Sequence, residues 1–503
     1  MPRKPGIRSK ASVNPEPFSV PGVPSTIATT MPSQTSSHTD LQTLATEVMH
    51  RALHAGATDA EAVVYEGEEF SALVRLGEIE TLQESSSRAV GLRVFLGQRV
   101  ASVSSSDFSA DSLDRLAANA LDLARITGED PFAGLPEESS LGEVPGGAAA
   151  QHLFFEDVVR MDPAKRIEIA RRVEAAALQY DTRIQNSKGG DFDTAVSRKV
   201  LVNSRGFSGE YRKSYCGFSA APIAQDAAGA MQGNYWYSSA RTAELLEDPE
   251  HIGRIAAQRA LRHLGARKVP TQQVPVVFSP EIARGLIGNI FSAAEGDAVY
   301  RNASMFSGML GQRVAGENIT VVDDGTLVFS HAHATSGAAV LTGGFGTSPF
   351  DAEGLPTRRT VLVERGILKN YVTNTYTGRK LGMPSTGNAS RGLAGNPGTG
   401  SHNFFLEPGS QTPEEIFATV DSGLYVTSVM GFGVNLVTGD YSQGASGLWI
   451  EHGELSYPVE EITIAGNLRD MYQNISAVGN DLHFRGSSAV PTLRVDGMMI
   501  AGA

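Results

Sequence analysis

Between residues 60 and 105, apolar and polar side chains alternate with a period of two, and this pattern constrains the fold more than any other feature of the chain. A β-strand points successive side chains to opposite faces, so the alternation indicates antiparallel strands with one buried face. We expect four or five strands here, with turns near Gly67, Gly77, Ser86 and Gly97-Gln98. Residues 182–240 repeat the pattern, with a hairpin turn at Asn203-Ser204-Arg205-Gly206.

Segments with helical periodicity flank both sets of strands and can cover the apolar face of a sheet. Asp40 is suited to cap the first helix, and Asp162-Pro163 is a favourable start for the third. A linker at Lys268-Val269-Pro270 follows the last helix, so we interpret residues 41–270 as one α+β domain. The expected helices cover residues 41–56, 109–127, 163–179 and 249–264.

The second half, residues 271–503, is rich in glycine and predicts short strands joined by turns. Helices are expected over 280–294 and 413–420, the second beginning with a capping box at Thr412 and Glu415. Residues 330–348 are typical of a mobile loop or of an extra hairpin. The expected fold class is therefore α+β, with an N-terminal helix and antiparallel-sheet domain and a β-rich, glycine-rich C-terminal domain.

The first 40 residues differ from the rest because proline, serine and threonine dominate them. Such a composition cannot form a packed core, so we expect a disordered N-terminal tail over residues 1–40. The tail begins with basic residues but lacks the apolar region of a secretory signal. A misassigned start codon is an alternative explanation for it.

Charge and cysteine content narrow the possible partners and compartments. The formal net charge of −13 disfavours direct contact with nucleic acid, whose phosphates need a basic surface. The single cysteine, Cys216, excludes an intramolecular disulfide and suits a reducing compartment. No window has the roughly 18 uninterrupted apolar residues of a membrane span. We therefore expect a cytoplasmic protein that contacts neither DNA nor a membrane.

The segment from Gly439 to Leu482 carries a long and specific motif, GDYSQGASGLWIEHGELSYPVEEITIAGNLRDM, followed by VGND. These two motifs closely resemble the C-terminal signature of the TldD/PmbA family, on its PmbA branch, which is also called TldE. The resemblance is strongest from about residue 275 onward. In the first half it rests on GLRVFLGQRVAS and EDPFAGLP.

The resemblance implies a heterodimeric metalloprotease in which the TldD branch carries HExxxH on the helix that opens the second domain, with a late cysteine completing the zinc site. Two imidazoles and a thiolate hold zinc, and the glutamate takes the proton of the bound water. Here the two histidine positions fall on Ile287 and Ser292, and the glutamate position on Gly288. Residues 479–497 contain no cysteine. We therefore expect no cofactor in this chain, with zinc in a TldD-like partner.

Other candidate ligands and nucleophiles have simpler interpretations. His50 and His54 lie four residues apart on a helix and could clamp a metal, but they face away from the apolar stripe and are expected to be solvated. His331 and His333 would point to one side of a strand, without an acidic or cysteine neighbour. Cys216 lies in a strand-like segment and is expected to be a small strand residue rather than a nucleophile.

The resemblance implies a metalloprotease subunit that acts on small or unfolded peptides and is inactive by itself. Candidate residues of the substrate cavity are His402, Asn403, Asp440 and Tyr441, with a satisfied loop histidine as the alternative for His402. A second hypothesis is a non-enzymatic interaction protein that modulates DNA gyrase or a toxin–antitoxin system. A third is a self-sufficient homodimeric hydrolase.

Overall fold

The structure of the chain is a computed structural model that describes residues 40–332, 337 and 339–502. The expected tail, apart from Asp40, and His333 lie outside the described residues. Asp40 caps the first helix by accepting a hydrogen bond from the backbone N–H of Gln42. None of the helices in the described part of the chain is long and apolar enough to cross a membrane.

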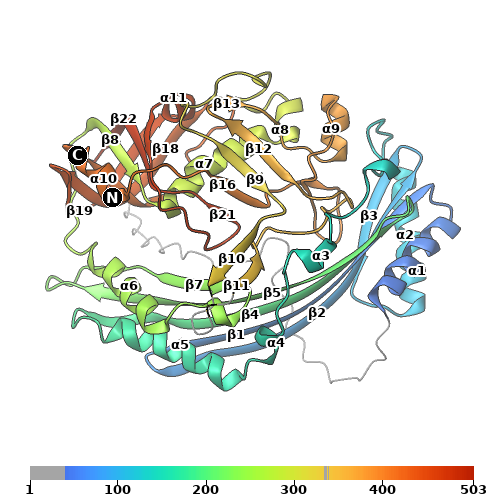
Figure 1. The fold of residues 1–503 in the computed structure, drawn as a ribbon. Coiled ribbons are helices and arrows are strands. Elements are labelled where there is room, and N and C mark those ends of the chain that lie inside the picture. The colour runs from blue at the N-terminus through green and yellow to red at the C-terminus, as the bar shows by residue number, and fades with distance from the viewer. Residues whose placement is uncertain (1–39, 333–336, 338, 503) are drawn as a thin grey trace, which may run out of the picture. The chain divides into compact units, whose positions relative to one another are not determined.

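The first half is built on a seven-stranded antiparallel sheet of unusually long strands, coloured blue to green in Figure 1. The strand order is β3-β2-β1-β4-β5-β6, and β7 also pairs with β5. The strands are β1 (Asp59–Arg75), β2 (Glu78–Leu96), β3 (Arg99–Ser105), β4 (Ile184–Asn203), β5 (Ser208–Gln225), β6 (Met231–Gly233) and β7 (Trp236–Ala240).

The prediction of four or five strands over residues 60–105 was wrong, because three longer strands form there. Gly77 and Gly97 lie in the turns, as expected, but Gly67 and Ser86 lie inside β1 and β2 on adjacent rungs. Gly67 allows the Tyr65 ring to lie over its backbone, since an added Cβ would come within 2.7 Å of Tyr65 Oη. The glycine therefore permits a close approach rather than a turn. The predicted hairpin at Asn203–Gly206 is confirmed, between β4 and β5.

Four helices pack on one face of this sheet (Figure 1). At one end of the strands lie α1 (Leu41–His54) and α2 (Ala110–Ile126); at the other lie α5 (Pro163–Leu178) and α6 (Pro249–Leu261). Each lies within three residues of its predicted bounds. Shorter elements complete this half: η1 (Glu138–Ser140), α3 (Gly147–Ala150), α4 (Glu156–Arg160) and η2 (Ala243–Leu245).

The second half contains a six-stranded sheet, β19-β18-β17-β8-β22-β20, and a five-stranded sheet, β13-β12-β9-β16-β21. Residues of both sheets and of helix α7 share one apolar core. The alternative of a hairpin within residues 330–348 is confirmed by β10 and β11, whose connecting residues are only partly described. The capping box of α10 is confirmed at Thr412 and Glu415.

The strands of the second half are β8 (Gln272–Phe278), β9 (Val321–Asp324), β10 (Val328–Ala332), β11 (Ala339–Gly343), β12 (Arg359–Glu364), β13 (Ile367–Leu368), β14 (Ala389–Ser390), β15 (Gly398–Thr399), β16 (Asn403–Leu406), β17 (Ser422–Met430), β18 (Asp440–Glu451), β19 (Glu454–Asn467), β20 (Ile475–Val478), β21 (Ser488–Ala489) and β22 (Leu493–Ala501). The helices are α7 (Pro280–Ala294), α8 (Gly296–Tyr300), α9 (Thr375–Leu381), α10 (Pro413–Ala418) and α11 (Leu468–Gln473). Together the two halves confirm the α+β fold class.

Candidate functional site

A buried histidine–carboxylate pair lies where β9 meets the start of β16. Antiparallel pairing sets Phe404 opposite Asp323 and Asn403 opposite Asp324, which brings His402 beside the end of β9. Both aspartates and both predicted residues, His402 and Asn403, are buried. The ladder thus joins segments that lie about 80 residues apart in the chain.

The Asp323 carboxylate fixes the His402 ring. Asp323 Oδ1 accepts the backbone N–H of His402 at 2.7 Å, and Oδ2 lies 3.0 Å from His402 Nδ1. Asn388 Nδ2 also donates to Oδ2, at 2.6 Å. His402 Nδ1 also lies 3.1 Å from Asn388 Nδ2, which already donates to Asp323. The carboxylate favours the tautomer with the proton on Nδ1, in which Nε2 is the acceptor nitrogen. Among the described residues Nε2 has no hydrogen-bond partner, so this arrangement could exchange a proton with a bound molecule.

Asn403 has a different environment from its neighbour. Its Nδ2 donates to the Asp324 carbonyl oxygen at 2.7 Å and to Thr347 Oγ1 at 2.8 Å. Its Oδ1 accepts the backbone N–H of Gly346 at 2.9 Å. The side chain is fully buried and connects β16 to the turn after β11. These contacts stabilise the loop next to His402.

Two further buried carboxylates belong to the turn over residues 351–354. Asp351 accepts backbone N–H groups of Glu353, Leu355 and Ala389 at 2.9–3.0 Å. Glu353 accepts the backbone N–H of Thr375 at 2.9 Å. Burial raises the pKa of Asp351, and burial together with the Asp351 charge raises the pKa of Glu353 to about 7.

This turn lies near an ion-pair cluster that connects the second half to the first sheet. Glu61 Oε1 on β1 accepts a hydrogen bond from Arg93 Nη1 at 2.8 Å and lies 3.2 Å from Arg391 Nη2. The side chains of all three residues are buried. The cluster carries two guanidinium groups for one carboxylate.

The other two predicted residues, Asp440 and Tyr441, begin β18. Asp440 is exposed and accepts a hydrogen bond from Thr438 Oγ1 at 2.6 Å. Tyr441 is only 4% exposed and packs in the large apolar core, where burial raises its pKa to about 12. No hydrogen bond, ion pair or ring contact between described residues joins this pair to His402 or Asn403. Whether the four residues line a substrate cavity stays a prediction.

The residues at the expected zinc positions on α7 do not suit a metal. Ile287 is fully buried in the core, Gly288 has no side chain, and Ser292 is half-buried. None of the three supplies the imidazole, thiolate or carboxylate ligands that zinc prefers. Within residues 40–332, 337 and 339–502, no group of three or more His, Cys, Asp or Glu residues has an arrangement that could hold a metal ion.

The alternative candidates also have defined surroundings. His50 and His54 are exposed, with ring centroids 6.3 Å apart. His331 Nε2 lies 3.0 Å from Thr342 Oγ1. Cys216 is a buried residue of β5, as predicted, and burial raises the pKa of its thiol. A thiol in such surroundings is a poor nucleophile.

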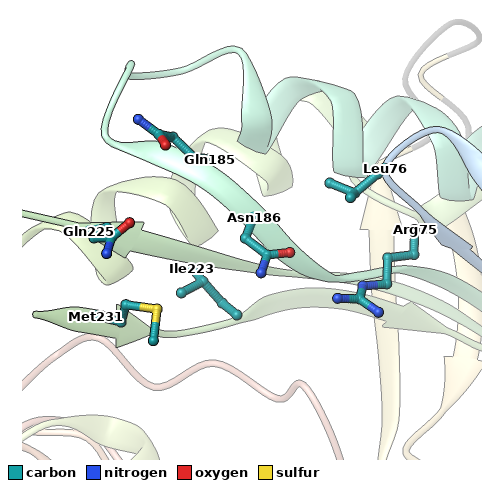
Figure 2. Close-up of a pocket in the computed structure, with 7 residues that line it drawn as sticks. All are labelled: Arg75, Leu76, Gln185, Asn186, Ile223, Gln225 and Met231. Carbon is teal, nitrogen blue, oxygen red and sulfur yellow. The ribbon is translucent and has the colours of Figure 1, made fainter. Parts of the chain in front are cut away.

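A separate pocket of about 450 Å³ lies at one end of the first sheet (Figure 2). It shares no residue with the histidine–carboxylate network, and Arg75 is its only ionisable lining residue. Arg75 is held by the Ser187 carbonyl oxygen at 3.0 Å. The pocket therefore has no evident acid, base or nucleophile. Its lining consists of Arg75, Leu76, Gln185, Asn186, Ile223, Gln225 and Met231.

Sequence reasoning identified His402 and Asn403 but missed the carboxylates around them. Asp323 and Asp324 end an apolar strand, and acidic residues at a strand end are a usable signal. Asp351 and Glu353 lie in a turn, where no local pattern marks their carboxylates as buried. No local pattern indicates that Asn388 reaches Asp323, because 65 residues separate them.

The domain architecture is that of a metallopeptidase class. Models of the PmbA/TldA metallopeptidase match the chain in three parts: domain 1 over residues 60–124, the central domain over 156–264 and the C-terminal domain over 271–502. The chain belongs to the PmbA/TldD family, on its PmbA (TldE) branch.

Individual relatives agree with this assignment. Metalloprotease PmbA of Escherichia coli O157:H7 is 36% identical over 451 residues, which cover 90% of this chain and 94% of that protein. A crystal structure from Bacteroides thetaiotaomicron, described as a modulator of DNA gyrase, superposes with a TM-score of 0.83 at 27% identity, covering 92% of this chain and all of that one. TldE from Thermococcus kodakarensis shares the fold, with a TM-score of 0.78 at 21% identity over 91% of this chain and all of that one.

Proposed function

We propose that this chain is the zinc-free subunit of a metalloprotease that processes small or unfolded peptides, and that a TldD-like partner supplies the zinc. The observation that carries the proposal is helix α7, where none of the residues at the positions expected for the zinc motif, Ile287, Gly288 and Ser292, has a side chain that zinc prefers. The isoleucine side chain is buried in the core and has no atom that could bind a metal in any rotamer. The single buried cysteine suits a subunit that works in the cytoplasm.

In this proposal the chain contributes to the substrate cavity rather than to the metal site. His402 supports this role best, because its Nδ1 is held by Asp323 and its Nε2 has no partner among the described residues. Such a ring can accept one hydrogen bond from a peptide N–H with little rearrangement. Glycine-rich strand edges can pair with an extended peptide backbone, which gives affinity with little sequence preference.

Co-expression with a TldD-like protein, followed by size-exclusion chromatography and zinc quantification, tests the proposal. We expect a heterodimer that contains zinc and cleaves peptides, whereas the chain purified alone should contain no stoichiometric zinc and show no peptidase activity. One zinc per chain in the isolated protein, together with proteolysis that a chelator abolishes, would contradict the proposal and favour the homodimeric hydrolase.

The cavity residues are tested in the reconstituted pair. We expect His402→Ala and Tyr441→Phe to slow peptide cleavage, and His50→Ala, which changes an exposed histidine, to leave it unchanged. His402→Asn serves as a second variant that keeps a polar side chain beside Asp323. Unchanged cleavage by both His402 variants and by Tyr441→Phe would remove these residues from the cavity.

A second function, modulation of DNA gyrase, is supported by the description of the Bacteroides thetaiotaomicron relative. The net charge of −13 permits binding to a basic protein surface and disfavours direct contact with DNA. A pull-down that recovers gyrase without any TldD-like partner would favour this function over the first. Recovery of the TldD-like protein alone would reject it.

A further inference from the structure

The face of the first sheet opposite the helices has a polar pattern along β4. Phe192 and Val200 point into the cores beneath the helices, and Thr194 Oγ1 accepts a hydrogen bond from Arg166 on α5. Because side chains alternate along a strand, residues 191, 193, 195, 197 and 199 point to the opposite face. These residues are half-buried, so their side chains are in part accessible.

One end of this row carries two lysines without a partner. Lys199 on β4 pairs with Tyr211 on β5, and Lys213 pairs with Ser197, so the two lysines lie on neighbouring rungs of the same face. Neither lysine forms a hydrogen bond or ion pair with a described residue, although Lys213 Nζ lies 5.1 Å from the centre of the Tyr211 ring. Burial and Arg391 lower the pKa of Lys199 to about 8, and burial, Arg241 and Lys199 lower the pKa of Lys213.

Arg391 adds an unsatisfied cation beside the lysines. Its side chain is only 3% exposed, and neither Nη1 nor Nη2 makes a hydrogen bond. Its ion-pair partner Glu61, at 3.2 Å, is shared with Arg93, and Asp351 and Glu353 are the other carboxylates near it. A buried guanidinium group without hydrogen bonds is costly, so this end of the face is suited to receive an anion.

The other end of the row is acidic. Asp191 accepts a hydrogen bond from Ser219 Oγ, and Asp193 is bonded to Ser71. Burial and the neighbouring charge raise the pKa of Asp191 to about 7, and burial and Glu69 raise the pKa of Asp193. No described cation forms an ion pair with either aspartate. Lys199 lies six positions after Asp193 in one strand, a distance of roughly 20 Å at about 3.3 Å per residue.

The surface between these ends carries two short side chains on β4 and tyrosine rings on both neighbouring strands. Ala195 and Ser197 lie between Asp193 and Lys199 on β4. The Tyr65 ring lies over Gly67, which is opposite Ser197 on β1, and the Tyr215 ring lies over Gly217, which is opposite Asp193 on β5. Aromatic rings beside short side chains can pack against an extended peptide. An extended peptide of about six residues spans the same 20 Å.

We propose that this face binds an extended peptide of about six residues, with its carboxylate at Lys199 and Lys213 and its ammonium group at Asp191 and Asp193. The termini or the side chains of the peptide supply these two groups. The inference rests on the proposed function, because it specifies which peptides the subunit selects. The proposed binding face on β4 and β5 is separate from the cavity residues His402 and Tyr441, which belong to the second half.

The test is calorimetric titration of the full chain with hexapeptides of alanine and serine. The peptides carry free ends, a C-terminal amide, an N-terminal acetyl group, or both caps with lysine and glutamate at the two ends. We expect amidation to weaken binding to the natural chain by about tenfold, the order expected for losing one charged contact. Acetylation should weaken it similarly, and tripeptides should bind less tightly than hexapeptides. Retained binding of the doubly capped peptide assigns the charges to side chains, whereas its loss assigns them to the termini.

Variants at the lysines separate binding from folding. Lys199→Met and Lys213→Met should abolish the preference for a free carboxylate, and Lys199→Arg should retain it. Lys165→Met, on the exposed face of α5, is the matched control and should behave as the natural chain. We expect the melting temperature of Lys199→Met to stay the same or rise, because the replaced amine is desolvated and unpaired.

Equal affinity for acid and amide peptides together with no binding of the doubly capped peptide, or unchanged binding of all four peptides in both lysine-to-methionine variants, would overturn the inference. Cleavage by the reconstituted pair distinguishes this failure from failure of the proposed function. If the pair cleaves peptides but the lysine variants do not alter the choice of peptide, only the inference fails. If no TldD-like pair forms or cleaves, the proposed function fails whatever the lysine variants do.

Discussion

At the scale of single residues, the buried carboxylates determine how the protein responds to pH. Glu353 is 1% exposed, next to Asp351, and its pKa is raised to about 7 by burial and by that neighbouring charge. In the unfolded chain a glutamate has a pKa of about 4.3. Between these two values the folded state therefore binds more protons than the unfolded state. The contribution of Glu353 to stability is largest below about pH 4.3 and is lost as the pH rises towards 7.

We predict that Glu353→Gln reduces the fall in unfolding free energy between pH 5 and pH 7. The amide cannot ionise, and its oxygen can still accept the backbone N–H of Thr375. Urea denaturation at pH 5, 6, 7 and 8 measures the slope. Part of the slope should remain, because the pKa of Asp191 is also raised to about 7. The exposed Glu138→Gln is the control, and an equal slope in the Glu353 variant and the natural chain would contradict the prediction.

At the scale of elements, the hairpin between β1 and β2 depends on a helix that is distant in sequence. Its two turn residues, Leu76 and Gly77, both have positive φ, 50° and 83°. This geometry suits a two-residue hairpin but is unfavourable for leucine. Glu174 on α5 accepts the backbone N–H of Leu76 at 2.9 Å and that of Gly77 at 3.0 Å. The buried carboxylate thus stabilises the turn.

Glu174→Gln should lower the unfolding free energy by about 1–3 kcal/mol, because the amide nitrogen cannot accept a backbone N–H. Hydrogen exchange at Leu76 and Gly77 should accelerate more than exchange elsewhere in β1. Glu168→Gln, on an exposed position of the same helix, provides the comparison. If the two variants have the same stability and the same exchange at the turn, Glu174 does not hold the hairpin.

At the scale of the whole molecule, one arginine joins the two halves. Arg241 follows β7 and is buried without a carboxylate partner among the described residues. Its guanidinium group donates to the carbonyl oxygens of Gly343 and Gly344 at 2.7 Å, and of Phe345 and Ser214 at 3.1 Å. Burial lowers the pKa of Arg241 to about 10. Three of these carbonyl groups belong to the last residue of β11 and the two residues after it, so one side chain connects the first sheet to the second half.

Arg241→Met should destabilise the protein by about 3–5 kcal/mol, because it leaves four carbonyl oxygens, three of them in buried hydrogen bonds, without their donor. Arg241→Lys should be intermediate, since an ammonium group cannot reproduce the planar fork. Denaturation midpoints and limited proteolysis near residues 343–348 measure the effect. Arg160→Met, at an exposed arginine, is the control. A change below about 1 kcal/mol in Arg241→Met would show that the carbonyl groups find other partners.

Local patterns predicted much of the fold. The helices over 41–56, 109–127, 163–179, 249–264 and 280–294 formed within three residues of their expected bounds. They could be predicted because periodicity and capping depend on residues only a few positions apart. Strand ends were harder to predict, since Gly67 was interpreted as a turn but lies inside β1. A glycine inside a strand and a glycine in a turn have the same local signal.

The candidate site was only partly predictable for the same reason. His402 and Asn403 were found from their loop motif, whereas Asp323, Asn388 and Glu353 became part of the site through contacts that span tens of residues. A sequence does not show which carboxylates are buried away from solvent and which stay exposed.

The sequence by itself determined the alternation of helices and strands, the family and the residues at the expected zinc positions on α7, because each is carried by a run of neighbouring residues. Only the tertiary structure decided which charges are buried together, which side of β4 stays polar, and that Arg241 connects the two halves. Burial and long-range hydrogen bonds depend on which distant segments meet, and that is a property of the folded chain.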